Sequence, residues 1–254
     1  MHRGLGRLVL VHSPLVGPAT WSGVAGELSS AGYDVIVPDL TPTLEAGPPY
    51  SQRQAGVIAG VIGRTPAETG DPRGVVLVGH SGAGALLGPA SLALDGLVAG
   101  SVVAGSVVAG CVFADAGLPI PGRSQLSTMP PDLAEWLVST ADADGWLPPW
   151  SSWWGDDELA LLVPDAGDRQ RFAADCPRLP LAMFEELQPE GDVGLGAFLR
   201  LSEVYDEPAR QARARGWPVI ERDSHHLAPV THPAMVATAL AELAGLLAEL
   251  DPPA

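Results

Sequence analysis

The sequence contains no lysine and no asparagine, so its 14 Lys-or-Arg positions are all arginine. Without lysine the chain has no amine for Schiff-base chemistry, no attachment point for pyridoxal phosphate, and no P-loop, in which a lysine contacts phosphate. A GC-rich coding bias explains both missing residue types. Their absence therefore excludes these three kinds of chemistry and points to no function by itself.

Positive charge is scarce as well. The 14 basic residues stand against 30 acidic ones, giving a formal net charge of −16 and a pI near 4.5. A chain this acidic repels the phosphates of nucleic acids and the headgroups of anionic lipids. We therefore expect neither nucleic acid nor a membrane surface as a partner.

Cysteine is almost absent. Cys111 and Cys176 form no C-x-x-C pair and no disulfide framework, so we expect two reduced thiols. The N-terminal residues run directly into an apolar strand without the pattern of a secretory signal. No apolar run reaches membrane-spanning length without a glycine. Together these features predict a cytoplasmic location.

The composition is that of a globular chain. With 254 residues, of which 46% are hydrophobic, it is long enough to bury a large core. Apolar runs alternate with helical patterns, which predicts an α/β fold with a mostly parallel sheet flanked by helices. Leu8–His12 and Asp34–Pro38 have the pattern of strands buried on both faces. Further strands are expected at Gly74–Gly79, Val108–Ala114, Ala197–Ser202 and Pro218–Arg222, and helices around Trp21–Ala31, Ser51–Ile62, Ser81–Leu94, Pro208–Arg215 and Pro233–Leu250.

Two stretches interrupt this alternation. Residues 98–111 contain the short repeat VAGSV-VAGSV-VAGC, for which a longer helix, a longer strand and a slipped duplication all stay open. Residues 118–195 are rich in proline and acidic side chains and hold five tryptophans: Trp136, Trp146, Trp150, Trp153 and Trp154. A linker would not contain so many large apolar rings. We therefore predict a small cap inserted into one domain that spans residues 1–254.

One motif indicates nucleophilic chemistry. The stretch Val75–Gly84 runs from a buried strand through Ser81, which is flanked by small residues, into a helix. A nucleophile at such a turn has a strained backbone, so its neighbours must be tiny. Ala83 stands where the strict motif has glycine, which exchanges one small residue for another. In this strand-turn-helix setting we predict that Ser81 is a nucleophile.

On these residues the chain resembles the α/β-hydrolase superfamily, in particular its small esterase-like members, over nearly its whole length. His12-Ser13-Pro14-Leu15, followed by Trp21, resembles the family's oxyanion loop. The run from Ser224 to Pro229 resembles the loop that carries the catalytic histidine. The resemblance implies that this histidine is His226, because it lies at the family's spacing before Pro233. His225 replaces a family glycine, and His232 lies too near the last helix.

The acid that would orient His226 is less clear from the sequence. Some family members carry it where this chain has Asp115, after the strand Val108–Ala114. The more usual place follows the next strand, where Glu203 and Asp206 lie, although the usual aspartate position falls on Val204. Glu185 is a further candidate. We expect Asp115, ahead of Asp206.

The resemblance also raises a difficulty. Family oxyanion holes use the N–H of the residue after the nucleophile, here Gly82, and one N–H from the loop that begins at His12. The residue expected to donate from that loop is Pro14, which has no N–H. Loss of one donor costs about two to three powers of ten in rate. Either Leu15 donates instead, or the protein does not run ordinary ester hydrolysis at speed.

The tryptophan-rich cap suggests an apolar or aromatic small molecule as the substrate. It is expected to lie between cap and sheet, against His12, Ser13, Pro14, His80, Trp150 and Trp154. The resemblance implies a serine hydrolase acting on an ester, thioester or lactone through an acyl-enzyme, without metal or organic cofactor. A zinc site has little support, because the sequence has no H-E-x-x-H.

Two other functions stay open. One is a non-hydrolytic enzyme of secondary metabolism, such as a cyclase, acyltransferase or lyase, that uses the same pocket. The other is a catalytically silent binding protein for a small molecule.

Overall fold

A computed structural model describes residues 6–62, 74–98, 108–191 and 193–250. In this part of the chain, a 6-stranded sheet has the order β2-β1-β3-β4-β7-β8, and every neighbouring pair is parallel. The predicted α/β fold is therefore confirmed. Its strands are β1 (Arg7–Val11), β2 (Asp34–Ile36), β3 (Val75–His80), β4 (Val108–Ala114), β7 (Gly196–Arg200) and β8 (Val219–Glu221).

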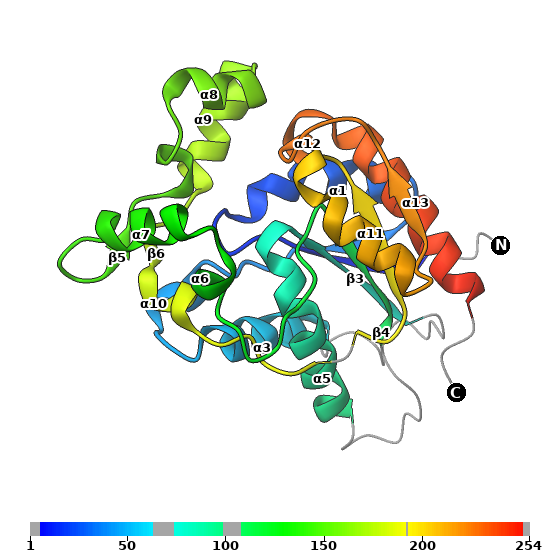
Figure 1. Cartoon of the computed structure of the whole chain (residues 1–254). Coiled ribbons are helices and arrows are strands. Elements are labelled where there is room, and N and C mark those ends of the chain that lie inside the picture. The colour runs from blue at the N-terminus through cyan, green and yellow to red at the C-terminus, as the bar shows by residue number, and fades with distance from the viewer. Residues whose placement is uncertain (1–5, 63–73, 99–107, 192, 251–254) are drawn as a thin grey trace.

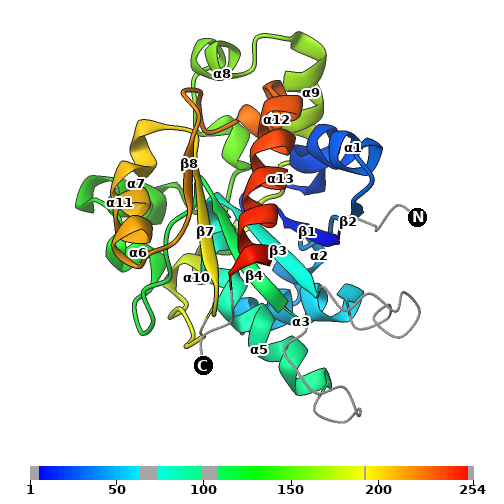
Figure 2. The same cartoon turned by 90° about the vertical axis from the view of Figure 1, so that its right-hand side faces the viewer.

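Helices cover both faces of the sheet. One face packs against α3 (Tyr50–Ile62), α5 (Leu87–Val98) and α11 (Asp206–Ala214). The other packs against α1 (Ser22–Ser30) and α13 (Pro233–Glu249), and Figure 2 shows α13 in front of the sheet. Because successive side chains of a strand point to opposite faces, a strand covered on both sides must be apolar throughout. The central strands β1, β3, β4 and β7 meet this condition between their ends, and the polar residues Arg7, His80 and Arg200 stand at the first or last position of a strand.

The edge strands differ from the sequence prediction. Asp34–Pro38 was expected to be a doubly buried strand, but β2 ends at Ile36, Asp34 is exposed, and Val35 and Ile36 are half-buried. The prediction is wrong because β2 lies at the edge of the sheet and has a neighbour on one side only. At the opposite edge, β8 is exposed to a similar degree.

The helix expected to begin at Ser81 starts as a tight turn. Residues Ser81–Leu86 form the 3₁₀ segment η2, and regular α-helix begins at Leu87. Of the VAGSV repeat, residues 99–107 lie outside the described part of the chain, while its last copy begins β4 as expected. None of the helices in the described ranges is long and apolar enough to cross a bilayer.

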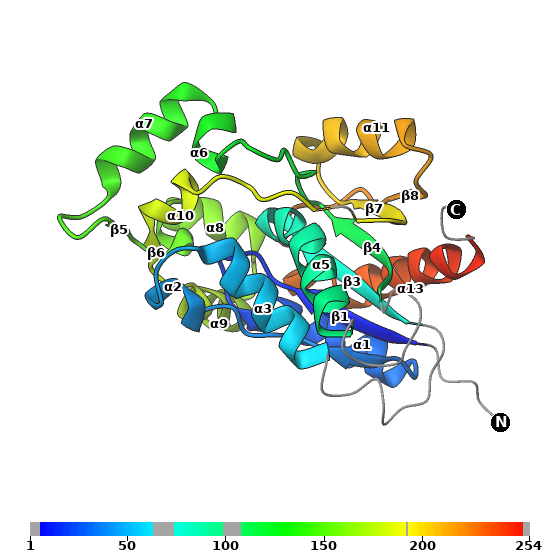
Figure 3. The same cartoon turned by 90° about the horizontal axis from the view of Figure 1, so that it is seen from below.

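Between β4 and β7 the chain leaves the sheet. This stretch contains two short antiparallel strands and several helices, and Figures 1 and 3 show α6, α7 and α10 at the end of the molecule away from α13. Its elements are α6 (Gln125–Thr128), α7 (Pro131–Thr140), β5 (Trp146–Leu147), η3 (Trp150–Ser152), α8 (Asp156–Leu162), α9 (Ala166–Asp175), β6 (Leu179–Pro180) and α10 (Leu181–Glu185). We call this stretch the cap.

The cap is held together by its aromatic rings. Trp136 packs edge-on against Trp153 at 5.3 Å, and Trp150 meets both Trp154 at 5.4 Å and Phe172 at 5.9 Å. Edge-to-face contacts of this kind stabilise a core beyond the burial of area alone. Most of the tryptophan surface is therefore used to build the cap.

Asp175, at the end of α9, joins the cap to the loop after β1. Its carboxylate accepts a hydrogen bond of 2.7 Å from the N–H of Ala19, at the start of the short segment η1 (Pro18–Trp21). A Cβ on Gly17 would lie 2.4 Å from the same carboxylate, so the contact requires glycine there. The hydrogen bond from Ala19 to Asp175 thus fixes the loop that begins at His12 against the cap.

We expect Gly84→Ala to destabilise the protein by about 1–3 kcal/mol, because an added Cβ would lie 2.3 Å from the carbonyl oxygen of Gly117. The matched control is Gly56→Ala in α3, where nothing lies within 4 Å of an added Cβ, and which should be neutral or stabilising by up to about 1 kcal/mol. Urea unfolding of both variants checks the pair. Equal stabilities would contradict the close packing at Gly84.

Candidate active site

The parallel sheet gathers residues from distant parts of the chain. Because the carboxyl ends of parallel strands meet at one edge, the loops that follow β1, β3, β4 and β8 all begin there. They carry His12, Ser81, Asp115 and His226, respectively. These residues lie up to 214 positions apart in sequence.

Ser81 has a strained backbone. Its φ is +58°, in the left-handed region that non-glycine residues rarely adopt. The turn is closely packed, since a Cβ on Gly79 would lie 3.1 Å from the carbonyl oxygen of Ala83. The residues next to Ser81 must therefore be small, as the sequence motif predicts, because a larger side chain would clash with the backbone of the turn. Strain of this kind is typical of a nucleophile at the end of a strand.

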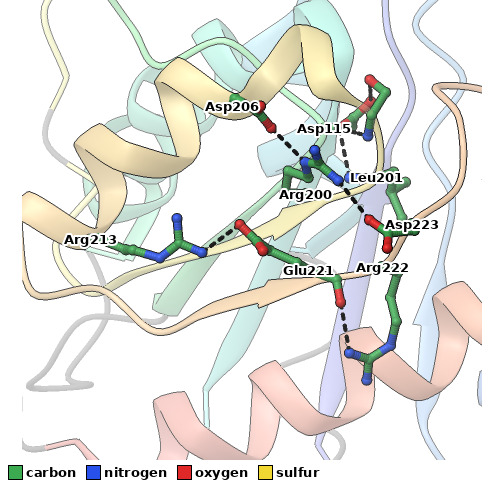
Figure 4. Close-up of polar contacts among 9 residues, drawn as sticks. Asp115, Arg200, Leu201, Asp206, Arg213, Glu221, Arg222 and Asp223 are labelled. Carbon is green, nitrogen blue, oxygen red and sulfur yellow. Dashed lines mark hydrogen bonds and ion pairs between the residues drawn. The ribbon is translucent and has the colours of Figure 1, made fainter.

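Asp115 is a fully buried carboxylate with four hydrogen-bond donors. Its Oδ1 accepts from the N–H groups of Leu201 at 2.8 Å and Ser202 at 2.9 Å, and Figure 4 shows the first of these contacts. Its Oδ2 accepts from the Ser202 hydroxyl at 2.6 Å and lies 2.9 Å from Nδ1 of His226. Four donors satisfy a charge that would otherwise be costly to bury.

These contacts favour the charged form of Asp115. Burial acts to raise the pKa of Asp115, but the hydrogen bonds from His226, Ser202 and Leu201 outweigh it and hold the pKa below its ordinary value. A carboxylate only accepts, so Nδ1 of His226 carries the proton in their contact. In the neutral ring the other nitrogen, Nε2, then has no proton and is able to accept one.

The imidazole of His226 lies between two other rings. His80 is stacked on it at 4.5 Å, and Tyr205 is stacked at 5.1 Å with an angle of 10° between the planes. Nε2 of His80 also donates to the carbonyl oxygen of His226 at 2.9 Å. The stack and this hydrogen bond fix the position of the His226 ring as well as its tilt.

Tyr205 was not identified from the sequence. Burial raises the pKa of its phenol to about 12, although a side-chain hydrogen bond with Ser81 acts in the opposite direction. A neutral phenol therefore contacts both Ser81 and His226. The only signal in the sequence was its position just after a strand end, next to Val204. Ser202 was missed as well, because its role depends on the buried side chain of Asp115.

The other acid candidates lie elsewhere. Asp206 accepts from Arg200 at 2.7 Å, an ion pair that Figure 4 shows beside Asp115. Glu203 and Glu185 are exposed. Val204, at the family's usual acid position, is 81% exposed and faces solvent. Of the four candidates, Asp115 is the one that the structure places against His226.

His12 holds its own loop. Its Nδ1 donates to the carbonyl oxygen of Ser13 at 2.9 Å, and its Nε2 accepts from the N–H of Leu40 at 3.0 Å. Burial lowers its pKa, which keeps the ring neutral. His12 and His80 have almost no exposed surface. Their contact with a substrate stays a prediction, and the geometry shows a supporting role for both.

The expected binding residues of the cap fall into two groups. Trp150 is half-buried and packs in the same apolar clusters as Leu15, at the boundary between cap and sheet. Trp154 instead lines an outer hollow of about 630 Å³ formed by η3, α8 and α9. None of the strand-end residues lines that hollow. Trp150 is therefore the better placed of the two for contact with a substrate at Ser81.

The carboxyl-end loops and the cap share an apolar cluster. Val16 from the loop after β1 and Leu227, next to His226, both pack with Phe172 of α9. The cap thus rests on two of the loops that form the candidate site. Among the described residues, no cluster of three His, Cys, Asp or Glu side chains is arranged to hold a metal ion.

Comparisons with known proteins agree with this fold. A model of the "Alpha/beta hydrolase family" matches residues 8–240. A search of curated sequences found no match. A similar solved structure is an extracellular alpha/beta-hydrolase from a Paenibacillus species, with 18% sequence identity, coverage of 93% of this chain and 98% of that one, and a TM-score of 0.70. A pyrethroid hydrolase from Sphingobium faniae has 19% identity, coverage of 96% and 99%, and a TM-score of 0.65. Tomato methylketone synthase I has 18% identity, coverage of 95% and 98%, and a TM-score of 0.65. Identities this low show a shared fold.

We expect the stability to fall as the pH decreases from about 6.5 toward 3. Burial, with the adjacent His226, lowers the pKa of His80 from 6.5 to about 3, so over this range the unfolded chain binds a proton that the folded one does not. Each pH unit then costs about 1.4 kcal/mol. Urea unfolding at several pH values should give a shallower slope for His80→Gln, which keeps an N–H donor. Identical slopes would show that His80 titrates normally.

Proposed function

Because the chain belongs to the alpha/beta hydrolase family, we propose that it is a serine hydrolase that cleaves an ester, thioester or lactone of a small apolar or aromatic molecule. The contact of 2.9 Å between Asp115 and His226, beside a strained Ser81, carries this proposal. It supplies a nucleophile, a base with a free ring nitrogen, and a buried carboxylate that orients the base.

The reaction has two halves. In the first, Oγ of Ser81 attacks the acyl carbon while Nε2 of His226 takes its proton, and the N–H of Gly82 donates to the developing oxyanion. His226 then protonates the leaving alcohol or thiol, which leaves an acyl-enzyme. In the second half His226 removes a proton from water, the hydroxide attacks the acyl carbon, and the acid departs as Ser81 recovers its proton. Asp115 stabilises the imidazolium in both halves.

Tyr205 and His80 assist by holding the base. A ring held between two others loses little freedom when it becomes charged, so the geometry of proton transfer is set in advance. The neutral phenol of Tyr205 also contacts Ser81, which keeps the nucleophile near the base before the substrate arrives.

The substrate class follows from the cap. Its apolar clusters reach the site at Leu15, Val16 and Leu227, and Trp150 packs with them. The names of similar structures mention pyrethroids, 2-tridecanone and salicylic acid, which are apolar or aromatic molecules. Both observations support a small apolar substrate rather than a sugar or a peptide.

The proposal extends to partners and location. With a net charge of −16, the protein is a poor partner for nucleic acid or an anionic membrane surface. Cys111 and Cys176 are both buried thiols, and burial raises the pKa of the Cys176 thiol to about 11, which makes it unreactive. Reduced, buried thiols are compatible with the cytoplasm.

Pro14 supports a second candidate. Without its N–H the usual second oxyanion donor is missing, so a non-hydrolytic reaction such as lyase, cyclase or acyl-transfer chemistry would use the same Ser81 and His226. One similar structure is named a methylketone synthase. Product analysis separates this reaction from hydrolysis, and a silent binding protein would give no product.

The first test is labelling with a fluorophosphonate probe together with turnover of short and aromatic nitrophenyl esters. We expect the wild-type protein to be labelled at Ser81 and to release nitrophenol, and Ser81→Ala to do neither. Folding of both proteins is checked by circular dichroism. If the wild-type protein is folded but is neither labelled nor active, the hydrolase proposal is wrong.

A second test separates the acids. Asp115→Asn should lower kcat by about four powers of ten, because an amide neither fixes the His226 tautomer nor stabilises its charged form. Asp206→Asn is the matched control, since Asp206 is half-exposed and pairs with Arg200 rather than with His226, and it should keep kcat within roughly threefold. An equal loss in both variants would argue against Asp115 as the acid.

A further inference from the structure

We propose that the hydroxyl of Ser13 is the second oxyanion donor and replaces the backbone N–H that Pro14 lacks. The inference rests on the proposed serine chemistry at Ser81. It assigns to Ser13 a hydrogen bond to the reacting oxygen, a role that ordinarily belongs to the main chain of this loop.

The first observation is the position of Ser13. Its Oγ lies 3.1 Å from the point that a Cβ on Gly82 would occupy, and Gly82 carries the first oxyanion donor. The next nearest atoms are carbons of Leu15 and Pro14, each at 3.6 Å. The hydroxyl is thus the polar atom that this loop presents to the residue after the nucleophile.

The second observation is that Ser13 is held rigidly. It is only 2% exposed. Its carbonyl oxygen accepts from Nδ1 of His12 at 2.9 Å and from the N–H of Val16 at 3.1 Å. Two bonds to one carbonyl fix the backbone from which the side chain extends. A donor fixed in this way needs no reorganisation when charge develops on the substrate.

The third observation concerns the hydroxyl proton. The N–H of Leu15 points at Oγ of Ser13, 3.3 Å away, so the oxygen acts as an acceptor in that contact. A hydroxyl that accepts still has its own proton to donate. The described residues provide no acceptor for that proton. An oxyanion beside Gly82 would be one.

The same contact bears on Leu15. Its N–H was the alternative donor expected from the sequence, and in this structure it is directed to Ser13. Leu15 therefore acts one step behind the hydroxyl: its N–H polarises the Ser13 O–H, which strengthens the bond that Ser13 donates. The Ser13 hydroxyl thus replaces the hydrogen-bond donor that Pro14 lacks, because a hydroxyl bonded to an anion is a strong donor.

The test compares Ser13→Ala with Ser13→Thr in nitrophenyl ester turnover. Ser13→Ala should lower kcat by about two to three powers of ten with little change in KM, because the donor acts on the transition state. Ser13→Thr keeps the hydroxyl and should stay within about tenfold of the wild type. Thermal unfolding shows whether each variant is folded, and if Ser13→Ala does not fold it is replaced by Ser13→Cys, whose thiol is a poor donor.

A second measurement does not depend on turnover. In a Ser81→Ala background a carboxylate such as phenylacetate can place an oxygen where the oxyanion would lie. Its binding, measured by calorimetry or NMR titration, should weaken about tenfold or more when Ser13→Ala is added, since hydrogen bonds to charged groups are strong.

The outcomes are distinct. An active wild type whose rate is unchanged in Ser13→Ala would overturn the Ser13 assignment alone. An inactive wild type that binds phenylacetate through Ser13 would overturn hydrolysis and keep the anion site. Equal phenylacetate binding with and without the Ser13 hydroxyl, or no binding to either variant, together with an inactive wild type, would overturn both.

Discussion

A buried negative charge at Asp115 organises the candidate site. The side chain is fully inaccessible to solvent, so its charge must be balanced from within the protein. Leu201 and Ser202, after β7, supply three of its hydrogen bonds, and His226, after β8, supplies the fourth. The loops after three strands are thus joined at one carboxylate. Moving any of them would leave part of a buried charge without a partner, which is far costlier than losing a surface contact.

Other contacts serve to keep this arrangement in place. Arg200, at the end of β7, pairs with Asp206 at 2.7 Å and with Asp223 at 3.2 Å, and Asp223 precedes His226 in the same loop (Figure 4). On the inner side the His226 ring is held by its two stacked neighbours. The carboxylates of these two ion pairs are at least half exposed, so each pair contributes little stability, but the pair with Asp223 restricts the loop that carries His226.

The sequence analysis predicted those features that depend on residues close together in the chain. The run from β3 through Ser81 needs small residues because of the turn itself, and the structure shows that strain as a φ of +58°. It was less decisive about the acid, since the choice between Asp115 and Asp206 depends on which carboxylate reaches His226 in the folded chain. The role of Tyr205 could not be predicted either, because it too depends on a contact between distant parts of the chain. Its stacking on His226 joins loops that follow different strands, and no pattern in either loop records it.

The edge strands and the oxyanion loop show two different limits of that reasoning. The apolar run at Asp34–Pro38 predicts burial on both faces, yet exposure depends on the order of strands in the sheet, which a single run does not encode. At Pro14 the residue type was interpreted correctly, because proline cannot donate. What the sequence could not show was that the neighbouring hydroxyl faces Gly82. A missing backbone donor is a loss only if no side chain fills its place, and that depends on where Ser13 points.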